Sequence, residues 1–223
     1  MCALSLFAVA VARSRTSLFA LGAGLAAFAY LAVAPVMRRP SRAQMQRVFL
    51  GLVLVVAVIP FLVAPLATVL GKSDPLNGRA GIWAGAMTIL HERPVTGYGF
   101  AVVWGRAQAT LLPHIAITAH WSATNAHNSI VHVATELGIP AALIACVYLF
   151  GALSNAGRLY EREPSAFSCF AAVFLVALAV MSFAEAHLLQ IHWMFWILFV
   201  ALTVTVRLAL NGGAPAARER TTP

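Results

Sequence analysis

Arginine side chains in the segment 71–127 have the chemistry of an anion-binding site. The basic and acidic residues of this segment are Lys72, Arg79, Arg93 and Arg106 against Asp74 and Glu92. Arg79 stands just before an apolar helical pattern, and a helix start offers free backbone N–H groups to an anion. A guanidinium fork also suits phosphate oxygens better than an ammonium does. Arg79 is therefore a candidate ligand for a diphosphate, with an ordinary solvated basic surface as the alternative.

Three histidines fall within 14 residues, at positions His114, His120 and His127, and raise the question of a metal site. Zinc-binding helices place two histidines four residues apart, whereas the spacings here are six and seven. Glu136 lies nine residues after His127, which is about 180° around a helix, so the two side chains face apart. The pattern argues against a metal, and we predict none.

Two acids lie closer to apolar stretches than the others. Ionisable groups near membrane segments are functional candidates by default. His132 and Glu136 are four residues apart and can pair on one helix face, which indicates an internal polar pair more often than a catalytic one. Glu185 lies with His187 and His192 between two apolar stretches. There it can contact a substrate or a neighbouring helix.

The composition places these residues in a membrane protein. Of the 223 residues, 61% are hydrophobic and only 10% are charged. A soluble domain carries about 25% charged residues. The chain cannot cover a water-facing surface, which excludes a soluble enzyme, a disordered chain and a nucleic-acid-binding domain. We predict a polytopic, all-α membrane protein, and the net charge of +8 then describes how charges lie around the bilayer.

Five apolar stretches reach the length of about 20 residues that a spanning helix needs. They are Thr16–Val36, Val48–Leu70, Asn128–Phe150, Ala166–Ala184 and Leu188–Leu210. A shorter stretch, Met1–Ala12, is interpreted as the remnant of a sixth span whose start is missing. We predict a single membrane domain over residues 1–223. Its parts are N-terminal spans (1–70), an external loop with short helices (71–127), C-terminal spans (128–210) and a cytoplasmic tail (211–223).

Basic residues orient this bundle. Met37–Arg47 contains four arginines and no acid, so it is expected on the cytoplasmic side. Alternation then places 71–127 outside, and Gly151–Ser165 and the tail inside. Arg13 and Arg15 fall on the external side against the usual bias. They either snorkel at the membrane surface or serve a site that needs positive charge there.

The external loop is expected to be folded. It contains five aromatic residues, Trp83, Tyr98, Phe100, Trp104 and Trp121, which is too many for a flexible linker. Ala80–His91 has an apolar helical face, which we expect to lie against the membrane surface. Gly97-Tyr98-Gly99-Phe100 predicts a tight turn that depends on glycine.

Four motifs in this order resemble the O-antigen ligase and polymerase superfamily. They are Ser14-Arg15-Thr16, Gly78-Arg79-Ala80-Gly81-Ile82-Trp83, Arg93-Pro94-Val95-Thr96-Gly97-Tyr98-Gly99-Phe100, and His127-Asn128 followed by Gly138. The resemblance covers roughly Ser14 to Phe150. The chain departs from the pattern at Ala141, where the ligase motif has a different small or hydroxylated residue. It is also shorter than family members, and we interpret it as the C-terminal half of a longer or split enzyme.

The resemblance implies a glycosyltransferase at the periplasmic face of the bacterial inner membrane. Its donor would be a glycan on undecaprenyl diphosphate, and its acceptor lipid A-core or a growing glycan. The lipid diphosphate is itself the leaving group, so no metal or other cofactor is implied. Carried over to this chain, Arg15 and Arg79 bind the diphosphate and His127 acts at the acceptor, where an imidazole can serve as general base. The further substrate-binding candidates are Arg13, Trp83, Arg93, Tyr98, Asn125 and Asn128.

Other functions compete with this interpretation. Within the superfamily, the His-Asn…Gly pattern favours a ligase over a polymerase or a protein O-glycosyltransferase. A transporter is suggested by the proline-broken stretch Leu52–Pro65, but no inverted repeat accompanies it. A non-catalytic remnant or partner subunit is the remaining alternative, because the expected N-terminal half is missing.

Overall fold

A computed structural model describes residues 15–37, 43–44, 46–48, 50–51, 54, 78–106, 125–189 and 194–212. Every regular element in these residues is helical, and none is a strand. The all-α prediction is confirmed to that extent. The helices are α2 (Arg15–Met37), α4 (Arg79–Glu92), the π-helical turn η1 (Val102–Arg106), α6 (Ser129–Leu137), α7 (Ile139–Arg162), α8 (Ala166–Ser182) and α9 (Met194–Gly212).

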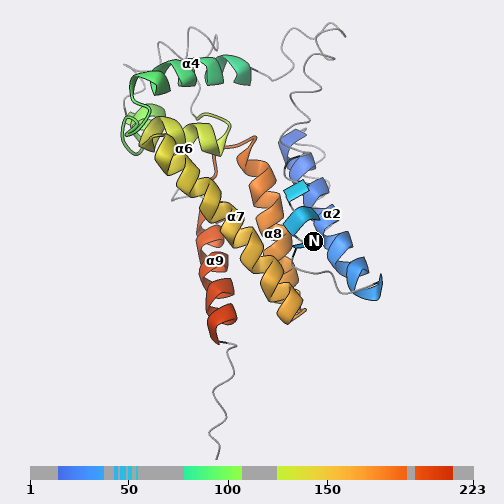
Figure 1. The fold of residues 1–223 in the computed structure, drawn as a ribbon. Helices are drawn as coiled ribbons and strands as arrows, with labels where there is room; N and C mark the ends of the chain where they lie inside the picture. Colours follow the sequence, from blue (N-terminus) through green and yellow to red (C-terminus); the bar gives the residue numbers. More distant parts are fainter. Residues whose placement is uncertain are drawn as a thin grey trace, which may run out of the picture.

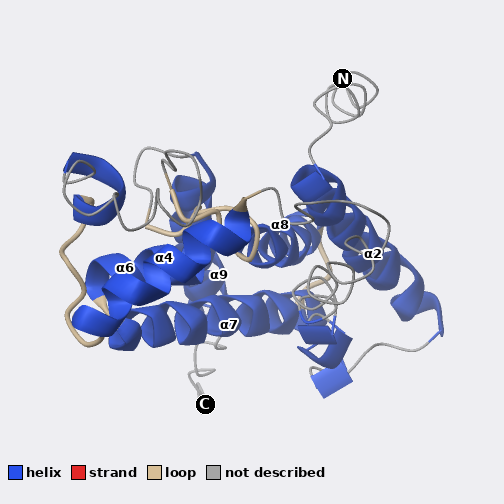
Figure 2. Ribbon diagram, turned by 90° about the horizontal axis from the view of Figure 1, so that it is seen from above, coloured by secondary structure: helices blue, strands red, loops and turns tan. Residues whose placement is uncertain are grey.

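The long helices form a bundle that is covered at one end by the short ones. Helix α2 packs mainly on α8, while α7 packs on both α8 and α9 (Figure 1). Helix α4 lies across one end of the bundle and packs on α6 (Figure 2). The shared core is rich in alanine, with Ala27, Ala156 and Ala171 fully buried. Small residues let helix backbones approach closely, so this bundle packs as membrane helices commonly do.

Two described helices, α7 and α9, are long and apolar enough to cross a bilayer. The apolar parts of the other two, Ala20–Val33 in α2 and Ala166–Ser182 in α8, are shorter. Many large apolar side chains face outward, including Ile144 and Val147 on α7 and Leu208 on α9. An extensive exposed apolar surface fits a lipid environment. The predicted stretch Met1–Ala12 lies outside the described residues, as does most of Val48–Leu70.

The predicted continuous span Asn128–Phe150 is wrong, because the helix is interrupted at Gly138. This glycine has φ +89°, ends α6 and begins α7. This interruption lets the turn of residues 94–99 pack against the junction of α6 and α7. Ile139 N donates to Pro94 O at 2.8 Å, and Gly99 N donates to Glu136 O at 2.7 Å. A continuous apolar pattern in the sequence conceals this break, because the glycine itself is compatible with an apolar run.

The predicted cytoplasmic loop Gly151–Ser165 is also too long. Helix α7 continues to Arg162, and only Glu163–Ser165 connects it to α8. The helix stops where Pro164 disfavours helical backbone in the residue before it. Ser165 then starts α8 with a reciprocal capping box to Ser168. Helix α7 is therefore about 36 Å long, from 24 residues at about 1.5 Å each.

The glycines of the predicted turn are required by its contact with α6. A Cβ on Gly97 would come within 2.4 Å of the Glu136 backbone, and a Cβ on Gly138 within 2.0 Å of Val95 O. Gly97 and Gly99 also have positive φ, so the predicted glycine-dependent turn is confirmed. The two glycine motifs, which lie about 40 residues apart in the sequence, are the two sides of one backbone contact.

Gly138→Ala is expected to lower the free energy of unfolding by about 3 kcal/mol, because the new Cβ overlaps Val95 O and the backbone is left-handed. Gly151→Ala on α7 is the matched control, since its Cβ meets nothing within 4 Å. Melting of the purified protein in detergent compares the two. Equal melting temperatures would show that the turn does not need its contact with α6.

The apolar face of α4 is covered by protein, not by the membrane surface as predicted. Its buried residues Ile82, Ala86 and Ile89 form one cluster with Val103, Trp104 and Ala126. The sequence showed the apolar face but not what would cover it. Helix α4 is thereby attached to the segment that precedes α6, which brings its first residue, Arg79, toward the end of the bundle.

Candidate active site

Three segments that are distant in the sequence meet at the end of the bundle that α4 covers. They are the start of α4, residues 125–128 before α6, and the turn of residues 183–189 that follows α8. Glu185, in that turn, joins all three. Its Oε1 accepts a hydrogen bond from Arg79 Nη2 at 2.9 Å, and its Oε2 lies 2.9 Å from His127 Nδ1. The three side chains are 22–27% exposed, so they are shielded yet reachable by a ligand.

The contact between His127 and Glu185 fixes how the imidazole can react. When Nδ1 carries the proton, it donates to the carboxylate and leaves Nε2 as a hydrogen-bond acceptor. A carboxylate that orients an imidazole in this way also stabilises the imidazolium formed when Nε2 takes a proton. Arg79 adds a fixed positive charge beside the same carboxylate. The group therefore combines a base with a cation in one partly buried place.

The backbone at His127 is held in an unusual conformation. Its φ is +46°, in the left-handed region that residues with a Cβ seldom adopt. Asn125 Oδ1 accepts from His127 N at 2.7 Å, and Trp83 Nε1 donates to Ala126 O at 2.9 Å. Asn125 and Trp83, both predicted to bind substrate, thus hold the backbone on the N-terminal side of His127. Such strain, retained by surrounding bonds, is common at functional sites.

Asn128 and Ser129 attach the 183–189 turn to the start of α6. Asn128 Oδ1 caps α6 by accepting from Ile130 N and Val131 N, while its Nδ2 donates to Phe183 O at 3.2 Å. Ser129 is fully buried; its Oγ donates to Glu185 O at 2.8 Å and accepts from His187 N at 2.9 Å. The described bonds of Asn128 go to backbone atoms, so in this structure it positions the turn that carries Glu185.

Ser129→Ala is expected to destabilise the protein by about 2 kcal/mol, because it leaves buried backbone groups of the turn without their partner. Any activity that depends on Glu185 should fall with it, since Glu185 loses its support. Thr203→Val is the control: Thr203 is also buried, and among the described contacts its hydroxyl bonds to Phe199 O within its own helix. Melting and activity are measured on both variants. If the two behave alike, Ser129 has no special role in the turn.

The charges around Glu185 keep it ionised. Burial raises its pKa, but the hydrogen bond and charge of His127, with Arg79 and His187, outweigh burial and lower the pKa below the usual 4.5. Burial lowers the pKa of His187 from 6.5, against the opposing effect of Glu185. Both groups lie in the turn outside the helices. Glu185 is thus an anion at neutral pH, as its contact with Arg79 requires.

Other predicted site residues lie elsewhere. Arg93 and Tyr98 form a cluster at the opposite end of α4, about 20 Å from Arg79 by helix length. The Arg93 guanidinium stands 5.0 Å from the centre of the Tyr98 ring, and the Tyr98 hydroxyl donates to Glu92 at 2.5 Å. The structure does not bring this pair to His127. Arg15 begins α2, but its side chain is not described, and Arg13 lies outside the described residues.

The predicted His132–Glu136 pair is present, and it contacts the segment that contains Ala101 and Trp104. Both side chains are buried, with His132 Nε2 3.8 Å from Glu136 Oε2. That carboxylate also accepts from Ala101 N at 2.9 Å, and the Trp104 ring stacks on His132. The pair therefore anchors the residues before η1 to α6. No three metal-binding side chains gather within the described part of the chain, and His114 and His120 lie outside it.

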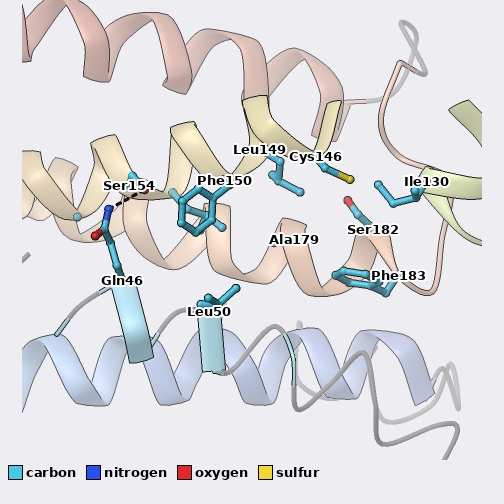
Figure 3. A pocket seen from close by; sticks show the side chains of 12 residues that line it. Gln46, Leu50, Ile130, Cys146, Leu149, Phe150, Ser154, Ala179, Ser182 and Phe183 are labelled. Carbon is cyan, nitrogen blue, oxygen red and sulfur yellow. Dashed lines mark hydrogen bonds between the residues drawn. The ribbon is translucent and has the colours of Figure 1, made fainter. Parts of the chain in front are cut away.

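An apolar groove begins next to the site. Its volume is about 140 Å³, and it runs between α7, α8 and the side chains of Gln46 and Leu50 (Figure 3). Ile130 and Phe183 line one end of the groove. Ile130 is two residues after Asn128, and Phe183 O accepts a hydrogen bond from Asn128 Nδ2. At the other end Gln46 Nε2 donates to Ser154 Oγ at 2.9 Å. The groove therefore offers an apolar path from the polar site along the bundle.

The sequence indicates that Glu185 can contact a substrate or a neighbouring helix, but it does not identify Glu185 as the partner of Arg79 and His127. Its contacts cross 106 residues to Arg79 and 58 residues to His127, which local sequence patterns cannot show. The only local signal was a carboxylate near the membrane, which is costly unless it has a function. The two residues it joins, in contrast, lie in motifs that carried the family resemblance.

Comparison with known proteins supports that resemblance for most of the chain. The sequence model of the family described as O-antigen ligase matches residues 1–146. This segment contains Arg79 and His127, whereas Glu185 lies beyond it. No curated protein and no solved structure matches the chain.

Proposed function

The chain belongs to the O-antigen ligase family, and from this we propose that it transfers a glycan from undecaprenyl diphosphate to lipid A-core at the periplasmic face of the inner membrane. Family membership implies a membrane glycosyltransferase-like protein that handles lipid-linked glycans in general. The observation that carries the specific proposal is Glu185, which holds a base and a guanidinium in one site.

The proposed reaction is a direct displacement. Nε2 of His127 takes the proton of the acceptor hydroxyl while that oxygen attacks the anomeric carbon. The bond from this carbon to the diphosphate oxygen breaks, and its electron pair remains on the diphosphate. Attack from the face opposite the leaving group inverts the anomeric centre. Glu185 stabilises the imidazolium that forms, as a buried carboxylate does in other His-dependent enzymes.

Arg79 is proposed to stabilise the charge that grows on the leaving diphosphate. It is the first residue of α4, and the preceding Gly78 has no side chain to cap the first N–H groups. Uncapped helix starts attract phosphate groups, and a fixed cation in a partly dry site favours developing negative charge. Arg15, at the start of α2, is proposed to contact the same diphosphate.

The apolar groove supports a lipid-linked donor. A polyprenyl chain is entirely apolar and needs a path through the protein or along its surface. The groove begins beside Ile130 and Phe183, the latter two residues before Glu185, and its large apolar lining residues include Leu50, Leu149, Phe150 and Leu153. A diphosphate at Arg79 would therefore have an apolar channel within reach of its lipid.

Arg79→Ala is expected to lower the transfer rate by about 10²-fold, as removal of one stabilising donor usually does. Arg79→Lys should fall between this and the wild type, because it keeps the charge but not the planar fork. Arg47→Ala is the control, since Arg47 is exposed and bonds only to Ala43 O among the described contacts. Equal rates for the Arg79→Ala and control variants would exclude Arg79 from the reaction.

The function is tested by supplying acceptors separately. The protein in a host without its own ligase, or purified with undecaprenyl-diphosphate glycan, is given lipid A-core and the products are separated by size. Glycan on lipid A-core supports a ligase. Glycan lengthened on its own lipid supports a polymerase, and glycan on added protein a protein O-glycosyltransferase. If the protein is present in the membrane but none of these three products forms, the proposal is contradicted.

A further inference from the structure

A second polar groove lies at the end of the bundle opposite α4. Its volume is about 440 Å³, and it is formed by the C-terminal parts of α7 and α9. Its polar lining is Asn155, Arg158, Arg162, Thr203, Arg207 and Asn211. Arg158 follows Ile139, the first residue of α7, by 19 residues, so it lies about 29 Å along the helix from the α6 junction. The groove is therefore separate from the site around Glu185.

The groove gathers three guanidinium groups without an acid in its lining. Asn155, Arg158 and Arg162 are three and four residues apart on α7, which puts them on one face. Arg207 approaches from α9. None of the three arginines forms an ion pair with a carboxylate in the described part of the chain. Arg162 Nη1 does donate to Leu210 O at 3.1 Å, which joins the two helix ends.

The same groove becomes apolar toward the middle of the bundle. Val147, Tyr148 and Gly151 line this part on α7, and Val147 is 72% exposed. A Cβ on Gly151 would meet nothing within 4 Å, so the groove is open there. The charged end and the apolar end follow the direction of two helices that are each long enough to cross a bilayer. The groove thus has a charged end that can receive a lipid headgroup and an apolar end that can receive an acyl chain.

We propose that this groove binds an anionic glycerophospholipid, with its phosphate among Arg158, Arg162 and Arg207 and an acyl chain along Val147, Tyr148 and Gly151. Basic pockets between transmembrane helices are suited to acidic lipid headgroups. Guanidinium forks match phosphate oxygens, and the two asparagine amides can bond the headgroup. A zwitterionic choline lipid fits less well, because its cation would face three arginines. Free phosphate leaves the apolar half of the groove unused.

The proposal requires a membrane location but not glycosyl transfer, so it can fail or succeed independently of the proposed function. The purified full-length protein in detergent is titrated with phosphatidylglycerol or phosphatidylcholine, and bound lipid is counted by native mass spectrometry. The Arg158→Gln/Arg207→Gln variant should bind phosphatidylglycerol at least tenfold more weakly than the wild type. The charge-matched control is Arg218→Gln/Arg220→Gln, whose positions lie outside the described residues; it should change affinity less than twofold.

A second variant tests the apolar half. Gly151→Phe places a ring in open space on a helix, so it should fold normally yet weaken lipid binding several-fold. Equal losses in the arginine variant and its charge-matched control would overturn the proposal, because net charge alone would then explain binding. It would also be overturned if phosphatidylcholine bound as tightly as phosphatidylglycerol, or if millimolar inorganic phosphate displaced the lipid.

Discussion

His127→Ala is expected to lower the rate of glycan transfer by about 10³-fold while the protein remains folded in the membrane. His127 Nδ1 lies 2.9 Å from Glu185 Oε2, and Nε2 is the atom proposed to take the acceptor's proton. Alanine leaves no base there, and a sugar hydroxyl is a poor nucleophile without one. The affinity for the donor should be unaffected, because the proposed diphosphate contacts are to Arg79 and Arg15. The rate constant should therefore fall much more than the affinity for donor.

The control for His127→Ala is His91→Ala. His91 is exposed in the last turn of α4, so the same change there should leave the transfer rate within about twofold of the wild type. Added imidazole should partly restore the His127→Ala variant if the missing group is a base. Transfer at a near-normal rate by His127→Ala would remove the general-base role, even if Arg79 still proved essential.

Local sequence motifs indicate Arg79 and His127 as candidate site residues, but they contain nothing about the residues that hold these two in place. Arg79 and His127 were identified from local motifs, and the structure places both against one carboxylate. The bonds that hold them there are long-range. Ser129 reaches the 183–189 turn across 56 to 59 residues, and the Trp83 indole reaches Ala126 across 43. Hydropathy and periodicity describe a segment's own faces, so they contain no information about such partners.

The errors in the helix predictions have a similar cause. The apolar run through residue 150 predicts one continuous span, whereas the helix is interrupted at Gly138. The turn around Gly97 packs against this junction of α6 and α7. The apolar face of α4 was correctly expected, but it is covered by η1 and the residues before α6. In both cases a local pattern identified an apolar surface, and packing between distant segments decided what covered it.

Glu185→Gln is expected to lower the transfer rate by about 10³-fold, although Gln is nearly the same size. The amide is neutral, so it cannot stabilise the imidazolium that His127 becomes. It also no longer pairs with Arg79, whose guanidinium then loses its fixed position. Because Glu185 acts partly through His127, Glu185→Gln should cost much less in the His127→Ala background than its 10³-fold in the wild type, and the loss that remains there reflects the lost contact with Arg79. Glu161→Gln, an exposed position on α7, is the control.

The pH dependence of stability separates this role from a merely local packing effect. Since the pKa of Glu185 is lowered in the folded protein, its ionised form stabilises the fold at pH values above the unfolded value of about 4.5. That stabilisation is lost as the pH falls through the lower folded pKa. The melting temperature of the wild type should therefore exceed that of Glu185→Gln at neutral pH, and the difference should shrink only below about pH 4.5. A constant difference at all pH values would mean that the amide merely packs badly. Rates that fall additively in the double variant would mean that Glu185 and His127 act separately.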